Sequence, residues 1–384
     1  MNTHVFGGLG KTTLLVADAL AEIEAGGGVL FVDPNGGAID ALLSLFPKRR
    51  SGDVLLIDPT DEEYPVGFNV LYNVPNKPLA ASIYSQTVKA IWNYLDVPTP
   101  VMDRMTYNVL AALLDYPGAT LLDVDRMLTD PTFRDIVLER VSDPLLLRKW
   151  NQWSRKPQKD WAALTQSTEN KAGEFTEDPR IRNIIGQARS TFDLKRLMFD
   201  RKVVLLRLPT GHLGRKSTMF GSLFLAHLQQ VAYSRAIQIP FSIYIDDCQH
   251  FDTPVLRQLL SSGRRYGLSL SLANQYLEQI SRELRSALIG NCDRRIMFKT
   301  GIEDSEYLHR TLPEDNTRPK LHQLERFEAI MFEGENSSRI ETFKTDPLPW
   351  GRRKRAMNIA SQSRRTYGVP RGKVEEAITQ SMGG

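Results

Sequence analysis

A glycine-rich segment near the start of the chain, VFGGLGKTTLL (residues 5–15), constrains the fold more than any other feature. The apolar stretch THVF is typical of a short β-strand, and the apolar residues that follow the glycines recur at helical spacing as far as Gly26. A glycine turn between a strand and a helix binds phosphate, because loop N–H groups and the helix N-terminus point at the anion. The segment therefore predicts a phosphate-binding loop in an α/β protein.

The loop departs from the usual pattern G-x-x-x-x-G-K-[ST], although its end, Gly10-Lys11-Thr12, fits. If Gly7 is the first glycine, the loop is shorter than the pattern. If Val5 takes that place, the loop has full length but begins on a β-branched residue. The Thr12 hydroxyl is the predicted Mg²⁺ ligand. The predicted nucleotide-binding residues are Gly7, Gly8, Gly10, Lys11, Thr12 and Thr13.

Apolar strands and helices alternate along most of the chain, which predicts a mostly parallel sheet with both faces covered. The eight expected strands are THVF, VLFVD, DVLLID, KVVLLRLP, FSIYIDD, LSLSLAN, RRIMFKTG and EAIMFEG. The strand pattern is interrupted between about residues 73 and 200, where apolar residues recur every three or four positions between prolines. We therefore expect an α/β core split by an all-α insertion domain. The predicted parts are residues 1–72 and 201–346 for the core, 73–200 for the insertion and 347–384 for a basic tail.

A second motif, FSIYIDDCQHF (residues 241–251), is an apolar strand that ends in two acids. Together with the glycine loop it indicates a Walker B strand, in which Asp246 would hold Mg²⁺ and Asp247 would polarise the attacking water. Most such ATPases have glutamate at the second position. Because water positioning is sensitive to about 1 Å, the shorter Asp247 is expected to slow hydrolysis without abolishing nucleotide binding.

Other polar residues lie where strands are expected to end. Gln275 follows the strand LSLSLA, so a parallel sheet would bring it to the edge that carries Asp246. Asp33, in FVDPNGG, lies either near the nucleotide or caps its own turn. Four arginines are candidates for an arginine finger that reaches a neighbouring subunit, and spacing alone does not choose among them: Arg264, Arg265, Arg294 and Arg295.

The composition favours a soluble protein: 41% of the residues are hydrophobic, and no apolar run approaches the roughly 20 residues of a spanning helix. Two cysteines are too few for a disulfide scaffold, so a reducing cytoplasm is expected. Between Gly351 and Lys373 lie eight basic residues and no acidic one. This tail would contact a phosphate backbone or an acidic partner, or it forms a solvated terminus. Its predicted DNA-binding residues are Arg352, Arg353, Lys354 and Arg355.

Taken in order, these segments resemble the HerA–FtsK superfamily of ring ATPases, and within it the coupling-protein branch (TraG/TraD-like) of conjugative DNA transfer. The resemblance covers most of residues 1–345. It rests on the phrases HVFGGLGKTTLL, FVDPNGG, VLLIDPTDEEYPVGFNVL, DPRIRNIIGQ, VVLLRLPTGHLG, IYIDDCQHF, GRRYGLSLSLANQYLEQI and GNCDRRIMF.

The resemblance implies a RecA-like P-loop core with an all-α insertion, assembled as a homohexamer that moves DNA with ATP and Mg²⁺. Lys11 and Thr12 match the Walker A residues, Asp246 and Asp247 the Walker B pair, Gln275 the sensor and Arg264 the finger acting in trans. The sequence departs from the family in its short loop, in Asp247, and in DPNGG, where relatives usually have a histidine or lysine and a second acid. The membrane segments of many coupling proteins are also missing, so the chain is expected in the cytoplasm or recruited to a membrane by a partner.

Two functions follow from this reading. The first is an ATP-dependent DNA translocase that acts in plasmid or mobile-element transfer. The second is a degenerate, non-hydrolysing subunit that binds nucleotide or DNA and recruits a DNA-processing partner. In either case a relaxase-like or secretion-channel protein is an expected partner.

Overall fold

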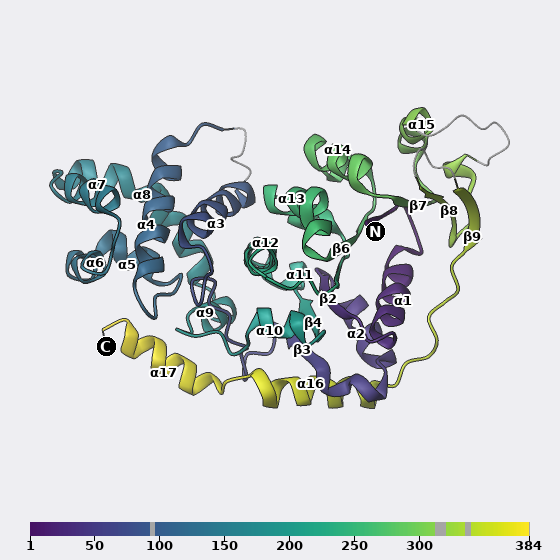
Figure 1. Ribbon diagram of the computed structural model, residues 1–384, viewed down its shortest axis with the longest axis horizontal. Coiled ribbons are helices and arrows are strands. Elements are labelled where there is room, and N and C mark those ends of the chain that lie inside the picture. Colours follow the sequence, from purple (N-terminus) through teal and green to yellow (C-terminus); the bar gives the residue numbers. More distant parts are fainter. Residues whose placement is uncertain (93–96, 312–319, 335–338, 384) are drawn as a thin grey trace.

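The computed structural model describes residues 1–92, 97–311, 320–334 and 339–383 (Figure 1). Within these residues nine strands form one sheet in the order β3-β4-β2-β5-β6-β1-β7-β8-β9. The first seven strands in this order are mutually parallel, and β8 and β9 extend the sheet as antiparallel neighbours. The strands are β1 (Thr3–Phe6), β2 (Gly28–Asp33), β3 (Val54–Ile57), β4 (Val203–Arg207), β5 (Phe241–Ile245), β6 (Leu268–Asn274), β7 (Arg294–Phe298), β8 (Glu328–Glu333) and β9 (Arg339–Lys344).

Helices cover both faces of the sheet because alternate residues of each central strand feed two apolar cores. Val29 and Phe31 of β2 pack on the side of α1 and α2, whereas Leu30 and Val32 pack on the opposite side, with α12 and α13. The core helices are α1 (Lys11–Glu24), α2 (Gly37–Leu45), α11 (Thr210–Leu213), α12 (Arg215–Tyr233), α13 (Pro254–Ser262), α14 (Arg282–Asn291) and α15 (Ile302–Thr311).

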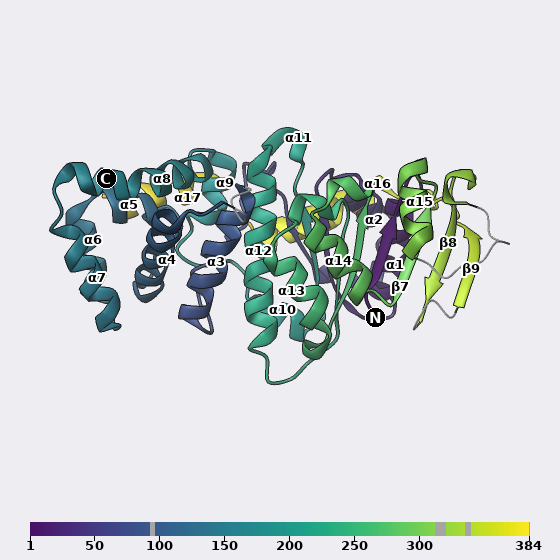
Figure 2. The ribbon, with the colours of Figure 1, turned by 90° about the horizontal axis from the view of Figure 1, so that it is seen from above.

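Between β3 and β4 the described chain forms helices and connecting loops, which lie beside the sheet in Figures 1 and 2. Aspartates begin several of these helices and are followed by proline: Asp130, Asp143 and Asp178 each accept a hydrogen bond from a backbone N–H of the first turn. The helices are α3 (Lys77–Ile91), α4 (Pro100–Asp115), α5 (Asp123–Thr129), α6 (Pro131–Leu138), α7 (Pro144–Ser154), α8 (Gln158–Thr176), α9 (Pro179–Ile185) and α10 (Leu194–Phe199). The predicted mostly parallel sheet with an all-α insertion is confirmed.

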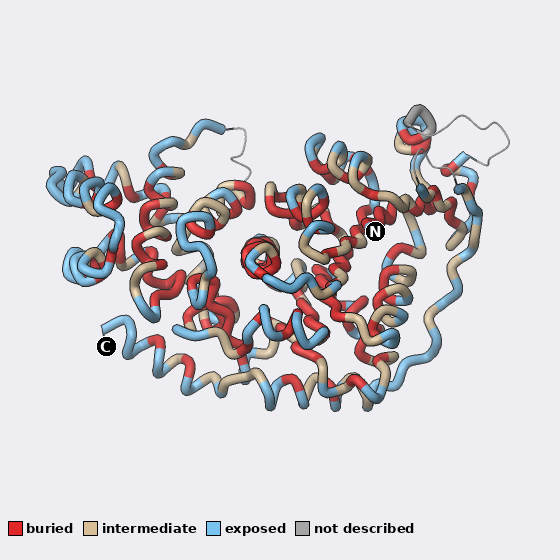
Figure 3. Tube along the Cα trace, viewed as in Figure 1, coloured by how far each residue is buried: buried red, intermediate tan, exposed pale blue. Residues whose placement is uncertain are grey.

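The insertion joins the core along α3, which packs against α12. Tyr84 of α3 and His227 of α12 are buried in this seam, with 3.1 Å between the Tyr84 hydroxyl and the His227 Nδ1. Figure 3 shows that α12 is buried, whereas α6 and α7, farthest from the sheet, are largely exposed. Among the helices that the structure describes, none is long and apolar enough to cross a membrane.

The basic tail forms two helices, α16 (Arg353–Tyr367) and α17 (Arg371–Ser381), that run along one long side of the molecule in Figure 1. Helix α16 packs on α2 and β3, and α17 packs on α9. Ser363 Oγ accepts a hydrogen bond of 2.8 Å from the N–H of Leu56 in the edge strand β3. Residues 353–381 are therefore a folded strap across the core and the insertion, and not the solvated terminus that charge alone left open.

Candidate nucleotide-binding site

The glycine loop occupies the space between β1 and α1 and consists of residues 7–10. Val5 is not part of it: the residue is fully buried within β1, paired with Ala273 and Ile296. Gly7 and Gly10 have φ values of +103° and +123°, and a Cβ atom on Gly10 would lie 2.3 Å from the Phe298 ring. The shorter of the two possible loops is therefore the one that forms, and it needs glycine at both ends.

The N–H groups of the short loop fall into two sets, those that anchor the loop and those that are left for a ligand. Gly7 N and Gly8 N donate to the carbonyls of Asn274 and Lys299, which anchor the loop to β6 and the end of β7. Across the described part of the chain, the N–H groups of residues 9–13 donate to no other protein group. They lie at the N-terminus of a 14-residue helix, where the partial positive charge favours an anion.

Lys11 lies over its own loop. Its ammonium donates to the carbonyl oxygens of Gly7 and Gly8, at 2.5 and 3.0 Å, and the side chain is largely buried. Burial lowers the pKa of the Lys11 ammonium, and the negative charges of Asp246 and Asp247 oppose that shift. A desolvated cation held near two carboxylates can bind the terminal phosphates of a nucleotide.

Asp246, at the end of β5, is within direct reach of the glycine loop although β6 lies between β5 and β1. The Thr12 hydroxyl donates to Asp246 Oδ2 at 2.6 Å, and Asp246 Oδ1 accepts the N–H of Asp247 at 3.1 Å. Burial raises the pKa of Asp246 to about 6, the hydrogen bond from Thr12 opposes the shift, and the charges of Asp247 and Asp33 add to it.

This pair of oxygen donors fits Mg²⁺. The ion is usually held by one or two carboxylates together with phosphate oxygens and water. Thr12 supplies a hydroxyl and Asp246 a carboxylate, and the raised pKa of Asp246 means that its charge is poorly compensated by the protein itself. A divalent cation would compensate it.

Asp247 is held by two side-chain amides. The Asn35 Nδ2 donates to Asp247 Oδ2 at 2.7 Å, and the Gln249 Nε2 donates to Asp247 Oδ1 at 3.3 Å. Neither amide was among the predicted site residues. Asn35 lies in the DPNGG phrase, whose departure from the family pattern is the sequence signal that could have led to it.

Of the remaining predicted residues, Asp33 and Gln275 lie at the sheet edge that carries the loop, and Arg264 lies at the opposite edge. Asp33 is fully buried and accepts the N–H groups of Asn35 and Ile39, so it caps its turn, while its charge also acts on Asp246. Gln275 is exposed just after β6, at the same edge as the loop. Arg264 precedes β6, at the opposite edge, and pairs with Asp293.

The other three arginines are also on or beside the amino ends of β6 and β7. Arg265 is exposed, Arg294 pairs with Glu333 at 3.0 Å, and burial lowers the pKa of Arg295. In the tail, Arg352, Arg353 and Lys354 are exposed, whereas Arg355 donates to the carbonyl of Phe46. The structure therefore brings the loop, Asp246 and Asp247 together and leaves the arginines apart from them within one chain.

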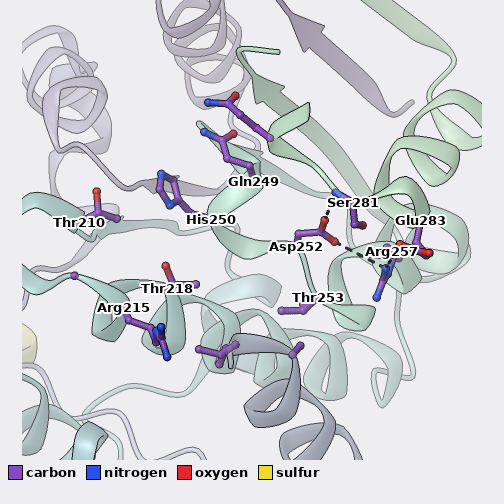
Figure 4. Close-up of a pocket in the computed structure, with 14 residues that line it drawn as sticks. Thr210, Arg215, Thr218, Gln249, His250, Asp252, Thr253, Arg257, Ser281 and Glu283 are labelled. Carbon is purple, nitrogen blue, oxygen red and sulfur yellow. Dashed lines mark hydrogen bonds and ion pairs between the residues drawn. The ribbon is translucent and has the colours of Figure 1, made fainter. Parts of the chain in front are cut away.

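A cavity of about 750 Å³ lies beside this site, between α3, α12, α13 and the start of α14 (Figure 4). Its wall includes Gln249 and His250, which directly follow the Walker B acids. On its far side Asp252 accepts the N–H of Ser281 and faces Arg257. The cavity lies at the junction of core and insertion, and Gln249 and His250 both line it and donate hydrogen bonds to Asp247.

Fold and site together define a RecA-like P-loop protein with an all-α insertion. The plasmid coupling protein TrwB has this architecture: its complex with ADP and Mg²⁺ is 14% identical, with a TM-score of 0.67, over 92% of this chain and 87% of the TrwB chain. The TrwB complex with the ATP analogue ADPNP gives a TM-score of 0.66 at 14% identity, over 92% and 86% of the two chains. VirB4 of Thermoanaerobacter pseudethanolicus gives a TM-score of 0.59 at 14% sequence identity, over 92% of this chain and 91% of the VirB4 chain.

At the level of the fold, these similarities confirm the resemblance to conjugative coupling proteins that was predicted from the sequence. No protein-family model matches the sequence, and neither does any curated protein.

Proposed function

We propose that this chain is an ATPase that assembles as a hexamer and moves DNA in plasmid or mobile-element transfer. The observation that carries the proposal is the direct contact between the loop and the Walker B strand, Thr12 Oγ1 to Asp246 Oδ2 at 2.6 Å. Support comes from TrwB, a plasmid coupling protein of the same fold that has been captured with ADP and Mg²⁺. The chain would act in the cytoplasm, alone or recruited to a membrane by a relaxase-like or secretion-channel partner.

In this proposal each element of the site has one task. The free N–H groups of residues 9–13 and the Lys11 ammonium bind the phosphates, and Thr12 and Asp246 hold Mg²⁺, which neutralises phosphate charge when bound. Asp247 orients the attacking water, and Gln275 senses the terminal phosphate from the same sheet edge. Arg264 lies at the opposite edge of its own sheet, so it would serve the phosphates of a neighbouring copy.

A non-hydrolysing scaffold is the second candidate, and one observation favours it. The Lys11 ammonium is already bonded to two loop carbonyls, so contact with a phosphate has to compete with these bonds. A subunit in which that competition fails would bind nucleotide weakly and act through DNA or a DNA-processing partner.

The deciding experiment is Mg²⁺-ATP binding and hydrolysis on one preparation, with and without DNA, beside Lys11→Ala. The motor predicts DNA-stimulated turnover that Lys11→Ala lowers at least 100-fold. Nucleotide binding that is weak, or that is not followed by turnover, would favour the scaffold. A Lys11→Ala protein that hydrolyses ATP at the parent rate would exclude the site as the source of activity.

The tail supplies a test of DNA contact. Because Arg352, Arg353 and Lys354 are exposed and Arg355 is engaged with Phe46, the first three carry the proposed phosphate contacts. Replacing all three with glutamine should reduce the slope of log affinity against log salt by about 2–3 for B-DNA. An unchanged slope would remove the tail from the DNA interface.

A further inference from the structure

Asp247 has a backbone conformation that is uncommon for a residue with a side chain. It lies immediately after β5 with φ 45° and ψ 55°, the left-handed region, where aspartate and asparagine are tolerated better than most residues. Its carbonyl oxygen accepts the N–H of His250 at 3.1 Å, which closes a short turn. The turn sets the direction of a carboxylate that is one methylene shorter than glutamate.

Asn35 approaches that carboxylate from a loop that is itself fixed. The Asp33 carboxylate accepts the N–H of Asn35 at 2.8 Å and that of Ile39 at 3.0 Å, and the Pro34 carbonyl accepts the N–H of Thr210 at 2.8 Å. The strand β2 that leads into this loop is hydrogen-bonded to β5, which leads to Asp247. The Asn35 amide is therefore presented at a set position relative to Asp247, although 212 residues separate the two in sequence.

We propose that Asn35 is a positioning residue for Asp247, and that it adapts the site to an aspartate in place of glutamate. The inference rests on the proposed ATP hydrolysis. A carboxylate offers about four acceptor positions, of which the amides of Asn35 and Gln249 use two. The others remain for the water that Asp247 orients, and two neutral donors fix the carboxylate without cancelling its charge.

Asn35 should affect turnover and leave nucleotide binding intact. Among the described residues, the Asn35 side-chain amide donates to Asp247 and to no group of the glycine loop or of the Thr12–Asp246 pair, and the side chain is exposed, so its removal leaves no buried gap. In Asn35→Ala we expect kcat for ATP to fall about 10- to 100-fold, because a displacement near 1 Å costs on this order. KM for Mg²⁺-ATP should stay within about threefold, since binding geometry is unchanged.

A double-mutant cycle gives the sharper test, because Asn35→Ala is expected to lower kcat in the parent and to raise it in the Asp247→Glu protein. With Asn35 in place, Asp247→Glu drives the longer side chain into the amide, so Asp247→Glu alone should be slower than the parent. In the Asp247→Glu/Asn35→Ala protein the extra methylene has room, and kcat should rise above that of Asp247→Glu. A faster Asp247→Glu protein with Asn35 intact, or strictly multiplicative losses, would overturn the inference.

Two controls separate this inference from the proposed function. Asn151→Ala, at an exposed position of α7, should match the parent in every assay. If the parent hydrolyses ATP and Asn35→Ala does so at the same rate, the inference fails and the proposed function stands.

If the parent has no ATPase activity, the proposed function fails, and the side-chain amide resonances of Asn35 in NMR then test the contact. They should shift in Asp247→Ala relative to the parent. Unchanged resonances would overturn the contact itself.

Discussion

The carboxyl edge of the sheet and the all-α insertion are stabilised in different ways. At the sheet edge, polar groups bond to one another: Thr12 to Asp246, Lys11 to its loop carbonyls, and Asp33 to the N–H groups of its own turn. The insertion has an aliphatic and aromatic interior, and aspartates cap several of its helices. The residues of the proposed nucleotide site therefore lie in the core, and mutations should separate the proposed nucleotide binding from the stability of the insertion.

The largest expected effect lies in the insertion. Trp150 of α7 is fully buried, with its ring 5.5 Å from that of Trp153 and 6.4 Å from that of Trp161. Trp150→Ala should lower the free energy of unfolding of the insertion by about 3–5 kcal/mol, measured by urea unfolding. Nucleotide affinity at low urea should not change. Trp350→Ala is the matched control, because Trp350 is fully exposed, and its effect should stay within about 0.5 kcal/mol.

Gly10→Ala should have the opposite effect: it should abolish nucleotide affinity and leave the insertion as stable as in the parent. A Cβ atom would lie 2.3 Å from the Phe298 ring at a φ of +123°, so the loop has to open, at a cost of about 2–4 kcal/mol. We expect nucleotide affinity, measured by calorimetry, to be lost while hydrogen exchange in α7 stays at the parent rate. Gly37→Ala, where nothing lies within 4 Å of the added methyl, should leave both unchanged. Parent-like affinity in Gly10→Ala would show that the loop is not the phosphate site.

The sequence predicted the core better than the contacts between its parts. The eight expected strands are present, because continuous apolar runs ending in glycine or aspartate are strong local signals. β9 was missed: it is an edge strand with mostly exposed side chains, so its formation depends on pairing with β8 and not on its own pattern.

In the candidate site, too, the features with a local sequence signal were predicted and those that depend on a distant segment were not. The Thr12–Asp246 pair followed from two motifs and the rule that parallel strands end at one edge, whereas Asn35 did not, because its partner lies 212 residues away. The fold of the basic tail was also unpredictable from charge. Arg364 pairs with Asp61 and Arg371 with Glu62, and such ion pairs exist only once the strap has been placed against its neighbours.

The seam between the two regions should respond to acid. Burial lowers the pKa of His227 to about 4, from an ordinary value of 6.5. The neutral imidazole therefore stabilises the fold above pH 6.5, and that stability is lost as the pH falls through 4. We expect a loss of roughly 1–3 kcal/mol between pH 6.5 and 4 that is absent in His227→Gln.

His4, in β1, adds to acid sensitivity in both proteins, because burial also lowers its pKa to about 4. The comparison is therefore between the two pH profiles of unfolding free energy. His212→Gln, at an exposed position of α11, should keep the parent profile. A His227→Gln profile identical to that of the parent would mean that the seam does not titrate.

The smallest expected effect concerns the strap. Ser363→Ala leaves the Leu56 N–H in β3 without its acceptor, which should cost about 1–2 kcal/mol. Hydrogen exchange should accelerate at Leu56 and along α16, while α17 keeps its protection, because Val374 and Ile378 remain buried and the Ser381 carbonyl still accepts from Arg126. Ser361→Ala, two positions earlier on α16, is the control. Equal acceleration in α16 and α17 would mean that the strap opens as one unit, and that it couples the core to the insertion.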